Sequence, residues 1–394
     1  MKQKNTVIMM LALFIVFVSS QAFAAIKVDC QKKSDTTWCD FSGNGDDLSE
    51  TIIDKIKEYK NNLVINILPG HYSFKPIEIR YRNNITINLN KNTKLIGIKK
   101  GDPSLKGVKA FISIRSAKNI VLSGAGSDVS IFDGQGASWW KVSSGKRPEF
   151  TYFKDIDGLK INGIGFHNSP KYNIELDHVK NVEINDIVVQ TSKDSPNTDG
   201  IIMTTASDVK INHIEVTNGD DCVAINADLG NGGASKNIKV TNATCNYGHG
   251  ISFGSNIHNT IENVVVDGVT FNQSNNGLRI KSHCEKENCS DTKNSLVKAI
   301  TYKNISMNGV KRPIVFQLSY KNVNNQFSLV KIKDITYDTI YARNSDKPAL
   351  FICEEPNACS QIRINSVSID TGGLCQGING SDPSNTTEDC PFKL

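Results

Sequence analysis

The sequence predicts an all-β protein with one domain, a right-handed parallel β-helix with a short N-terminal capping helix. Short runs of β-branched residues, separated by Asn, Gly, Ser and Asp, fill most of the chain, a pattern typical of short strands joined by turns. These runs share a motif of an apolar residue, two small or polar residues, an apolar residue, any residue and another apolar residue. Copies of the motif begin at Ile161, Ile184, Ile211, Val240 and Val266.

The spacing of these copies favours a solenoid. Successive copies start 23, 27, 29 and 26 residues apart, and weaker copies begin at Tyr302, Tyr337 and Ile364. A strand-rich repeat of this length is typical of a coil that buries its inward residues on its neighbours. The uneven spacing is expected because the loops of one face absorb extra residues. A β-propeller is the alternative, but each of its blades needs about 40 residues.

The N-terminus predicts export. Residues 1–24 have the form of a signal peptide, with a lysine-containing start, an apolar run from Val7 to Val18, and a cleavage site at Ala22-Phe23-Ala24. A membrane anchor would need about 20 apolar residues, more than this run provides. Residues 25–394 are then a single secreted, extracellular domain, with no membrane association after cleavage.

One amphipathic helix is predicted near the start of the domain, from Leu48 to Tyr59. We expect it to cap the open end of the β-helix, where it would prevent edge-to-edge pairing of the first coil.

The cysteines support an oxidising environment. All ten follow the predicted cleavage site, and an even number in an exported chain favours disulfides over a zinc site. Their spacing favours bridges between sequence neighbours, and the cysteines are Cys30, Cys39, Cys222, Cys245, Cys284, Cys289, Cys353, Cys359, Cys375 and Cys390. Possible glycan acceptors, in a eukaryotic host, are Asn84, Asn242, Asn272, Asn304, Asn379 and Asn385.

The charge balance limits the class of partner. Of the 394 residues, 22% are charged, and the formal net charge of +5 falls to +3 once Lys2 and Lys4 are removed with the signal peptide. Basic and acidic residues are well mixed, so the sequence does not predict a nucleic-acid-binding surface, which needs a concentrated basic stripe. A slightly cationic surface suits a polyanionic substrate.

Three aspartates stand out by their position in the repeat. Asp199 precedes Gly200, and Asp220 and Asp221 follow Gly219. Asp199 and Asp221 are 22 residues apart, close to one coil, and stacked strands lie about 4.8 Å apart. A turn or bulge at Gly219 would let both members of the Asp220–Asp221 pair face outward.

Later coils add further polar side chains to the same face. His249 lies between two glycines, and Arg279 and Lys281 alternate along the next predicted strand. A carboxyl whose pKa is raised by nearby like charges can protonate a leaving oxygen, and an ionised one can activate water. Arg and Lys would bind a carboxylated sugar. The cluster therefore predicts hydrolysis of a glycosidic bond.

Four motifs in this order resemble the signature motifs of the polygalacturonases: Asn197-Thr198-Asp199, Gly219-Asp220-Asp221-Cys222, Gly248-His249-Gly250 and Arg279-Ile280-Lys281. Further similarity comes from the segments at residues 132–136, 139–140, 168–170 and 252–255, so the resemblance extends from Cys30 to Cys390. It implies a secreted hydrolase of pectin that works by inversion, without a metal or other cofactor. We expect the protein to be a monomer.

The resemblance also implies roles for individual residues. Asp220 matches the general acid, Asp199 and Asp221 the pair that activates water, and His249 the histidine that tunes the protonation of the acid. Arg279 and Lys281 match the cations that bind galacturonate carboxylates, with Tyr320 and Asn197 as further substrate contacts. In Gln317-Leu318-Ser319-Tyr320 the family's acid is missing. Cys222 and Cys245 match a bridge between the acid-bearing and histidine-bearing coils. Spacing alone does not distinguish Asp220 from Asp221 as the acid.

Several alternatives remain at this stage. The favoured hypothesis is an endo-acting enzyme that cuts α-1,4 bonds between galacturonates, because no large insertion closes one end of the predicted groove. The alternatives are an exo-acting polygalacturonase, a catalytically inactive pectin-binding homologue, and a β-helix polysaccharide lyase that depends on calcium. A neutral-sugar or rhamnogalacturonan substrate is disfavoured because Arg279 and Lys281 supply the cations that uronates need.

Overall fold

The computed structural model of the chain describes residues 24–229, 232–286, 288–321, 326–353 and 358–376. Most of the predicted signal peptide lies outside the described residues, as do Cys390, Asn379 and Asn385. Among the described residues, no helix combines the length and the apolar character needed to cross a membrane.

The described residues form one α-helix, four short 3₁₀ helices and 24 strands. The helices are α1 (Ser49–Tyr59), η1 (Pro103–Leu105), η2 (Gly136–Ser138), η3 (Ser144–Lys146) and η4 (Ser290–Thr292). The strands are β1 (Ala24–Lys33), β2 (Thr36–Asn44), β3 (Leu63–Ile67), β4 (Gly70–Phe74), β5 (Ile77–Arg80), β6 (Asn83–Leu89), β7 (Thr93–Gly97), β8 (Ala110–Gly124), β9 (Ser130–Asp133), β10 (Glu149–Asn162), β11 (Gly165–His167), β12 (Ile174–Gln190), β13 (Ile201–Asn218), β14 (Val223–Ala227), β15 (Ser235–Tyr247), β16 (Ile251–Ile257), β17 (Thr260–Asn272), β18 (Asn276–Lys281), β19 (Leu296–Asn308), β20 (Arg312–Gln317), β21 (Lys331–Arg343), β22 (Ala349–Ile352), β23 (Cys359–Ile369) and β24 (Gly373–Gln376).

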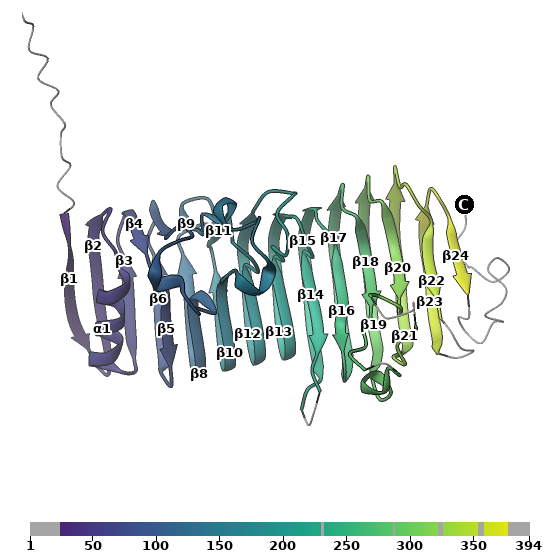
Figure 1. Ribbon diagram of the computed structural model, residues 1–394, viewed down its shortest axis with the longest axis horizontal. Helices are drawn as coiled ribbons and strands as arrows, with labels where there is room; N and C mark the ends of the chain where they lie inside the picture. Colours follow the sequence, from purple (N-terminus) through teal and green to yellow (C-terminus); the bar gives the residue numbers. More distant parts are fainter. Residues whose placement is uncertain (1–23, 230–231, 287, 322–325, 354–357, 377–394) are drawn as a thin grey trace, which may run out of the picture.

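The strands wind into a parallel β-helix, as predicted, with the coils stacked along the long axis of the molecule (Figure 1). The copies of the sequence motif stack in register, each on the next. Ile161 pairs with Ile184, Ile184 with Ile211, and Ile211 with Val240. The weaker copies continue the same column, since Tyr302 pairs with Tyr337. The repeat read from the sequence is therefore one corner of the coil.

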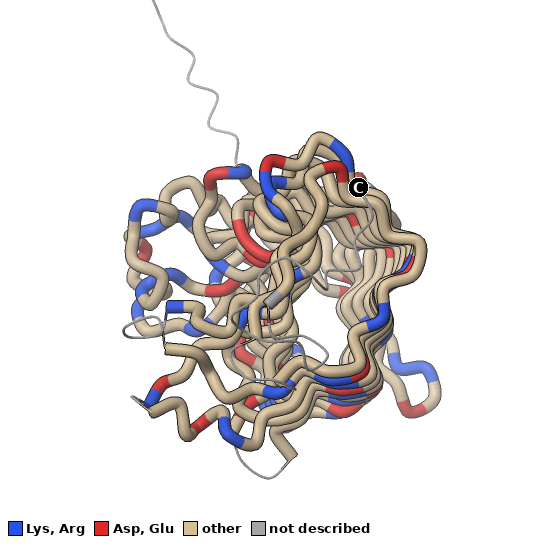
Figure 2. Tube along the Cα trace, turned by 90° about the vertical axis from the view of Figure 1, so that its right-hand side faces the viewer, with Lys and Arg blue, Asp and Glu red and all other residues tan. Residues whose placement is uncertain are grey.

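The inward side chains of this column form the core. Ile184, Ile211 and Val240 are buried, and at the C-terminal coils the rings of Tyr302 and Tyr337 stack with centroids 5.0 Å apart. Burial of apolar surface contributes roughly 25 cal/mol per Å², so a continuous column of such residues stabilises every coil interface. Viewed along the axis, the coils superimpose on one side and the loops spread on the other (Figure 2). Basic and acidic residues are mixed on the outer surface.

The bends within each coil need left-handed backbone. Asn119, Asn181, Asn237 and Asn263 have φ values near +55°. Asparagine tolerates this region better than most residues because its short polar side chain can hydrogen-bond locally. The Asn and Gly that separate the predicted strands are therefore bend residues.

The first coil is covered by a helix and by a strand. Helix α1 begins one residue later than the predicted segment and buries Ile52 and Ile56 in the core. One edge of β2 pairs with β3, and its other edge, at the end of the β-helix, pairs with β1, which runs antiparallel to it. The strand therefore protects this edge, a function that the sequence had suggested for the helix.

Disulfides join sequence neighbours, as predicted. The pairs are Cys30–Cys39, Cys222–Cys245, Cys284–Cys289 and Cys353–Cys359. The fifth predicted pair ends at Cys390, outside the described residues.

Candidate active site

The three aspartates lie where short loops enter parallel strands on one side of the β-helix. Ile201 of β13 pairs with Val223 of β14, and Val223 pairs with Ile251 of β16. Asp199, Asp221 and His249 each lie two residues before these partners, so they occupy the same position on three successive coils. The predicted superposition is therefore present in the structure.

Glycines allow the loops of these coils to approach closely. A Cβ atom on Gly219 would lie 2.1 Å from the carbonyl oxygen of Ser195, and one on Gly248 would lie 2.1 Å from the carbonyl oxygen of Asp220. Gly248 also has a φ of +57°. Any larger residue at these two positions would separate the loops that carry the acids and the histidine.

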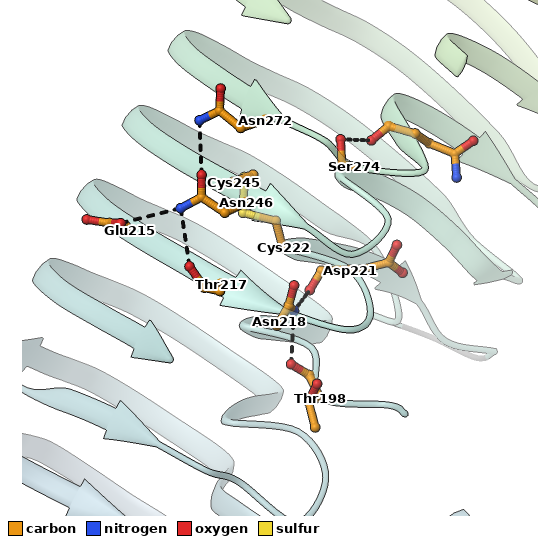
Figure 3. The surroundings of a disulfide bond; sticks show 11 residues. Thr198, Glu215, Thr217, Asn218, Asp221, Cys222, Cys245, Asn246, Asn272 and Ser274 are labelled. Atoms are coloured by element: carbon orange, nitrogen blue, oxygen red, sulfur yellow. Dashed lines mark hydrogen bonds between the residues drawn. A yellow bond between two sulfur atoms is a disulfide. The ribbon is translucent and has the colours of Figure 1, made fainter. Parts of the chain in front are cut away.

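A disulfide and an asparagine hold the same loops together (Figure 3). Cys222 and Cys245 form the bridge that the family resemblance implied. The Asn218 Nδ2 donates to the carbonyl oxygens of Thr198 and Asp221, each at 2.9 Å. Asn218 thereby joins the loop before β13 to the loop before β14, which fixes the relative position of the two acid-bearing segments.

Asp220 is the more exposed member of the Asp220–Asp221 pair. Its Oδ1 lies 2.9 Å from the Nδ1 of His249 and accepts a hydrogen bond of 2.9 Å from the backbone N–H of Asp221. Burial raises the pKa of the Asp220 carboxyl. The hydrogen bond and charge of His249, together with Lys281 and the Asp221 N–H, outweigh burial and hold the pKa below its usual value.

Asp221 is buried against two cations. Its Oδ2 lies 2.7 Å from the Lys281 Nζ, and its Oδ1 lies 3.2 Å from the Arg279 Nη2. The Ser252 hydroxyl donates to the same Oδ1 at 2.7 Å. The side chain of Asp221 is only 2% exposed, compared with 19% for Asp220.

Asp221 therefore faces the outer side of the coil with Asp220, as the turn at Gly219 suggests, but unlike Asp220 it is covered and does not reach solvent. Arg279 and Lys281 are also buried, because they turn toward Asp221 and cover it. An ionised carboxylate that leaves water needs such charged partners.

Asp199 is buried one coil before Asp221. Burial raises the pKa of its carboxyl well above the usual value, and the charges of Asp220 and Asp221 add to this effect. The sequence predicts a raised pKa for the carboxyl that donates the proton, which the family resemblance matches to Asp220. In the structure this expectation is wrong for Asp220, whose pKa is lowered by His249 and Lys281, and the raised pKa belongs to the more deeply buried Asp199. Asp199 and Asp220 thus have pKa values displaced in opposite directions, which is typical of sites that hold an acid and a base.

Two further predicted residues surround this cluster. The Tyr320 ring centroid lies 5.3 Å from the Lys281 Nζ and 5.7 Å from the guanidinium carbon of Arg279, within range of cation–π attraction. The Asn197 Nδ2 donates to the Oδ2 of Asp220 at 3.5 Å. All eight residues predicted from the sequence therefore belong to one connected group.

The site also contains three potential metal ligands. One ligand atom from each of Asp220, Asp221 and His249 lies within 4.8 Å of the others. Both oxygens of Asp221 are already bound by Lys281 and Arg279, and a divalent cation would be repelled by these two charges. The donor set therefore suits an ion-paired carboxylate better than a metal.

Two residues of the site have no role predicted from the sequence, although Ser252 lies in the segment 252–255 that resembles the family. Ser252 connects Asp221 to the Nε of Arg279, which donates to its hydroxyl at 3.2 Å. Its position one coil before Arg279 was available as a signal, since the two residues are strand partners. Arg147 donates to the Oδ1 of Asn197 at 2.6 Å from a loop outside the repeat, where no periodic pattern marks it.

Comparison with known proteins relates the chain to one enzyme family. The model for Glycosyl hydrolases family 28 matches residues 59–388. A probable endopolygalacturonase I from Aspergillus terreus is 30% identical over 313 residues, covering 73% of this chain and 80% of that protein. A polygalacturonase from Prunus persica is 29% identical over 293 residues, covering 71% and 70%. A polygalacturonase from Juniperus ashei is 29% identical over 282 residues, covering 66% of this chain but only 52% of that protein.

Solved structures show the same fold. The polygalacturonase from Erwinia carotovora superposes with a TM-score of 0.68 at 22% identity, covering 90% of this chain and 98% of that one. Endopolygalacturonase I from Stereum purpureum, solved with two galacturonates, gives 0.57 at 20% identity and coverage of 84% and 98%. An exopolygalacturonase from Thermotoga maritima gives 0.68 at 18% identity and coverage of 84% and 86%.

Proposed function

Because the chain belongs to family 28 of the glycosyl hydrolases and is a glycoside hydrolase of the polygalacturonase family, we propose that it is a secreted endo-polygalacturonase. It hydrolyses the α-1,4 bonds between galacturonates in pectin, with inversion and as a monomer. The disulfides of the described residues support an extracellular location, because such bonds persist in oxidising compartments.

The observation that supports this function most strongly is the arrangement of acids on adjacent coils. Asp220 is partly exposed beside His249, while Asp199 is buried and Asp221 is ion-paired below Arg279 and Lys281. Inverting hydrolysis needs one carboxyl that donates a proton to the leaving oxygen and another that activates water. The two neighbouring loops of the site provide both a partly exposed carboxyl, suited to donating a proton, and buried carboxyls, suited to activating water.

Asp220 is the proposed general acid. It is the most exposed of the three carboxyls, so it can reach the glycosidic oxygen. In the free site its pKa is lowered while that of Asp199 is raised, so a proton resides first on Asp199. Bound substrate covers Asp220, removes its water and brings a uronate carboxylate near it. Both effects raise the pKa of Asp220, so substrate binding favours transfer of the proton from Asp199 to Asp220 and leaves Asp199 ionised to activate water.

Asp199 and Asp221 are the proposed pair that activates water. They occupy equivalent positions on adjacent coils, at a strand spacing of about 4.8 Å, which suits two carboxylates that share one water molecule. Arg279 and Lys281 hold Asp221 in place. The same two cations, with Tyr320 beside them, offer charge to the carboxylate of a galacturonate.

The endo mode is supported by the short loops that follow the site along the chain. The connections from β15 to β16, β17 to β18 and β19 to β20 each contain three residues, so they do not rise over this face of the β-helix. Two longer connections favour the exo alternative. Residues 134–148, between β9 and β10, carry η2 and η3. The connection from β20 to β21 brings Tyr320 beside Arg279 and Lys281. Chain-length profiles of the products over time distinguish the two modes. Early oligomers of many lengths indicate endo action, and monomers or dimers from the start would refute it.

Replacing Asp220 with Asn tests the proposed chemistry. We expect reducing-end release from demethylated polygalacturonate to fall by about 10²–10⁴-fold, because a general acid typically contributes that factor. The circular dichroism spectrum should remain that of the wild type. Activity near the wild-type level in Asp220→Asn would refute the assignment of Asp220.

The same assay separates the remaining alternatives. A lyase would release an unsaturated product that absorbs ultraviolet light, and chelation of calcium would abolish its formation. An inactive homologue would retain polygalacturonate in a binding assay but release no reducing ends as the wild-type protein.

A further inference from the structure

We propose that Arg147 is a positioning residue for Asp220, acting through the side-chain amide of Asn197. The inference rests on the proposed role of Asp220 in the reaction. Arg147 lies outside the repeat, two residues before β10, and does not contact Asp220 through a hydrogen bond of the described residues.

The guanidinium of Arg147 is buried between two loops. Only 5% of the residue is exposed. Its Nη1 donates to the carbonyl oxygens of Pro170 and Pro196, at 2.9 and 2.5 Å. Its Nη2 donates to the Oδ1 of Asn197 at 2.6 Å. The planar fork of an arginine can bind several acceptors in fixed directions, which a lysine ammonium cannot reproduce.

These contacts determine which end of the Asn197 amide faces Asp220. Because the Oδ1 accepts from Arg147, the Nδ2 is directed toward the Oδ2 of Asp220, 3.5 Å away. The reversed amide would place its oxygen against the carboxylate and lose the bond to Arg147. The backbone of Asn197 has a φ of +56°, and Pro196, whose carbonyl Arg147 also binds, precedes it.

The amide reaches the oxygen of Asp220 that its other partners leave open. Both His249 and the backbone N–H of Asp221 contact the Oδ1. Among the hydrogen bonds of the described residues, the Oδ2 is reached by Asn197. A donor on this oxygen favours the ionised carboxylate and limits rotation of the carboxyl group. Removing Arg147 should therefore raise the pKa of Asp220 in two ways, through loss of a positive charge that acts on Asp220 directly and through release of the Asn197 amide, and it should loosen the orientation of the carboxyl. Asn197→Ser removes the amide and keeps the charge, so it isolates the positioning effect.

A purely structural role for Arg147 makes a different prediction. Since it ties the loops at Pro170 and Pro196, its loss will lower stability in either case. Arg312 provides a control, because its Nη1 donates to the carbonyl oxygen of Pro348 at 3.3 Å and its place in the stack lies three coils beyond Asp221. Loss of Arg312 should lower stability without any change at Asp220.

The test compares Arg147→Met, Arg147→Lys and Arg312→Met in the full chain. The first measurement is the titration of the Asp220 carboxyl carbon by ¹³C NMR without substrate, with the signal assigned by its loss in Asp220→Asn. We expect a higher pKa in Arg147→Met and no change in Arg312→Met. The second is steady-state hydrolysis, where we expect kcat to fall about 10–100-fold, the scale of a small misplacement, with KM within about threefold. Arg147→Lys keeps a positive charge, so it should restore part of the wild-type pKa of Asp220. It should restore little of kcat, because a lysine cannot bind the Asn197 amide and the two carbonyl oxygens in the same directions.

An unchanged Asp220 titration in Arg147→Met, or an equal change in Arg312→Met, would overturn the proposal. If Arg147→Met does not fold, Asn197→Ser removes the amide alone and should raise the pKa of Asp220 in the same direction. The NMR readout needs no turnover, so it still tests the positioning role if the wild-type protein does not hydrolyse polygalacturonate. In that case the proposed function fails independently.

Discussion

Two columns of polar side chains run along this β-helix, and they use the same stacking for opposite purposes. At one bend, asparagines bond to each other from coil to coil. Asn119 donates to Asn84 at 2.8 Å, and Asn263 donates to Asn237 at 2.7 Å. At the site, the corresponding stacking brings Asp199 next to Asp221. Amides carry a donor and an acceptor, so each coil satisfies the next. Carboxylates carry only acceptors, so their stacking creates repulsion and displaced pKa values.

The comparison shows that side-chain chemistry decides what the repeat does. The strand spacing is common to both columns, but the site needs additional cations to tolerate its acids. Arg279 and Lys281 supply these from β18, two coils beyond Asp221. Substitutions that remove a cation, an acid or an amide should therefore change the free energy of unfolding by different amounts and with different signs in the two columns.

The largest effect is expected from Lys281→Met. This change leaves Asp221 buried with one cation fewer, and breaking a buried ion pair typically lowers the free energy of unfolding by about 3–5 kcal/mol. Urea unfolding at neutral pH measures the loss. Lys298→Met is the control, because Lys298 pairs with Glu262 on the outer surface at 2.9 Å; an exposed pair contributes at most about 1 kcal/mol. Equal losses in the two variants would show that burial of Asp221 is not decisive.

An intermediate effect of the opposite sign is expected from Asp199→Asn. Burial and the charges of Asp220 and Asp221 raise the folded pKa of Asp199 above its unfolded value. The native state therefore binds this proton more tightly. The resulting stabilisation is complete below an unfolded pKa of about 3.9 and is lost as the pH rises through the folded pKa. The asparagine variant escapes that loss, so at neutral pH it should be more stable than the wild type by at least about 1.4 kcal/mol, the free energy that corresponds to one pKa unit, although inactive.

Urea unfolding of Asp199→Asn and wild type between pH 4 and pH 8 checks this sign. The difference in the free energy of unfolding should grow as the pH rises. A constant difference across this range, or a variant that is less stable at pH 7, would contradict a raised pKa at Asp199.

The repeat could be predicted from the sequence because every coil contains its own copy of the apolar motif. Ile161, Ile184 and Ile211 share a column, and each contributes the same apolar signal. The site residues could be predicted for the same reason, since Asp199 and Asp221 occupy equivalent positions. The contacts of an individual carboxylate could not be predicted in this way, because they do not repeat from coil to coil in the sequence. The burial of Asp221 depends on how far Arg279 and Lys281 reach, and the role of Arg147 depends on a loop outside the repeat.

The predicted glycan acceptors also show that a sequence motif does not reveal what its side chain contacts. Asn84, Asn242 and Asn304 carry the sequence of a glycan acceptor, yet their Nδ2 groups donate to neighbouring coils, at 2.6, 2.9 and 2.8 Å. Each of these bends needs a residue that adopts left-handed backbone and that can hydrogen-bond to the adjacent coil. The strand that follows each asparagine then carries Ser or Thr two residues later. The structure thus supplies a second physical reason for these sequence triplets.

The smallest effect is expected in the asparagine column itself, from Asn237→Ala. Asn237 donates to Asp208 at 2.9 Å, accepts from Asn263 and has a φ of +56°. The alanine loses two hydrogen bonds at an exposed position and must adopt left-handed backbone, so we expect a loss of about 1–2 kcal/mol. Asn237→Gly loses the same bonds without the backbone strain and should be less destabilising by about 1 kcal/mol. Urea unfolding of both variants separates the two contributions. Hydrolysis should remain at the wild-type level in both, because this column supports the coils without touching the acids; a fall in kcat would show that the two columns are coupled.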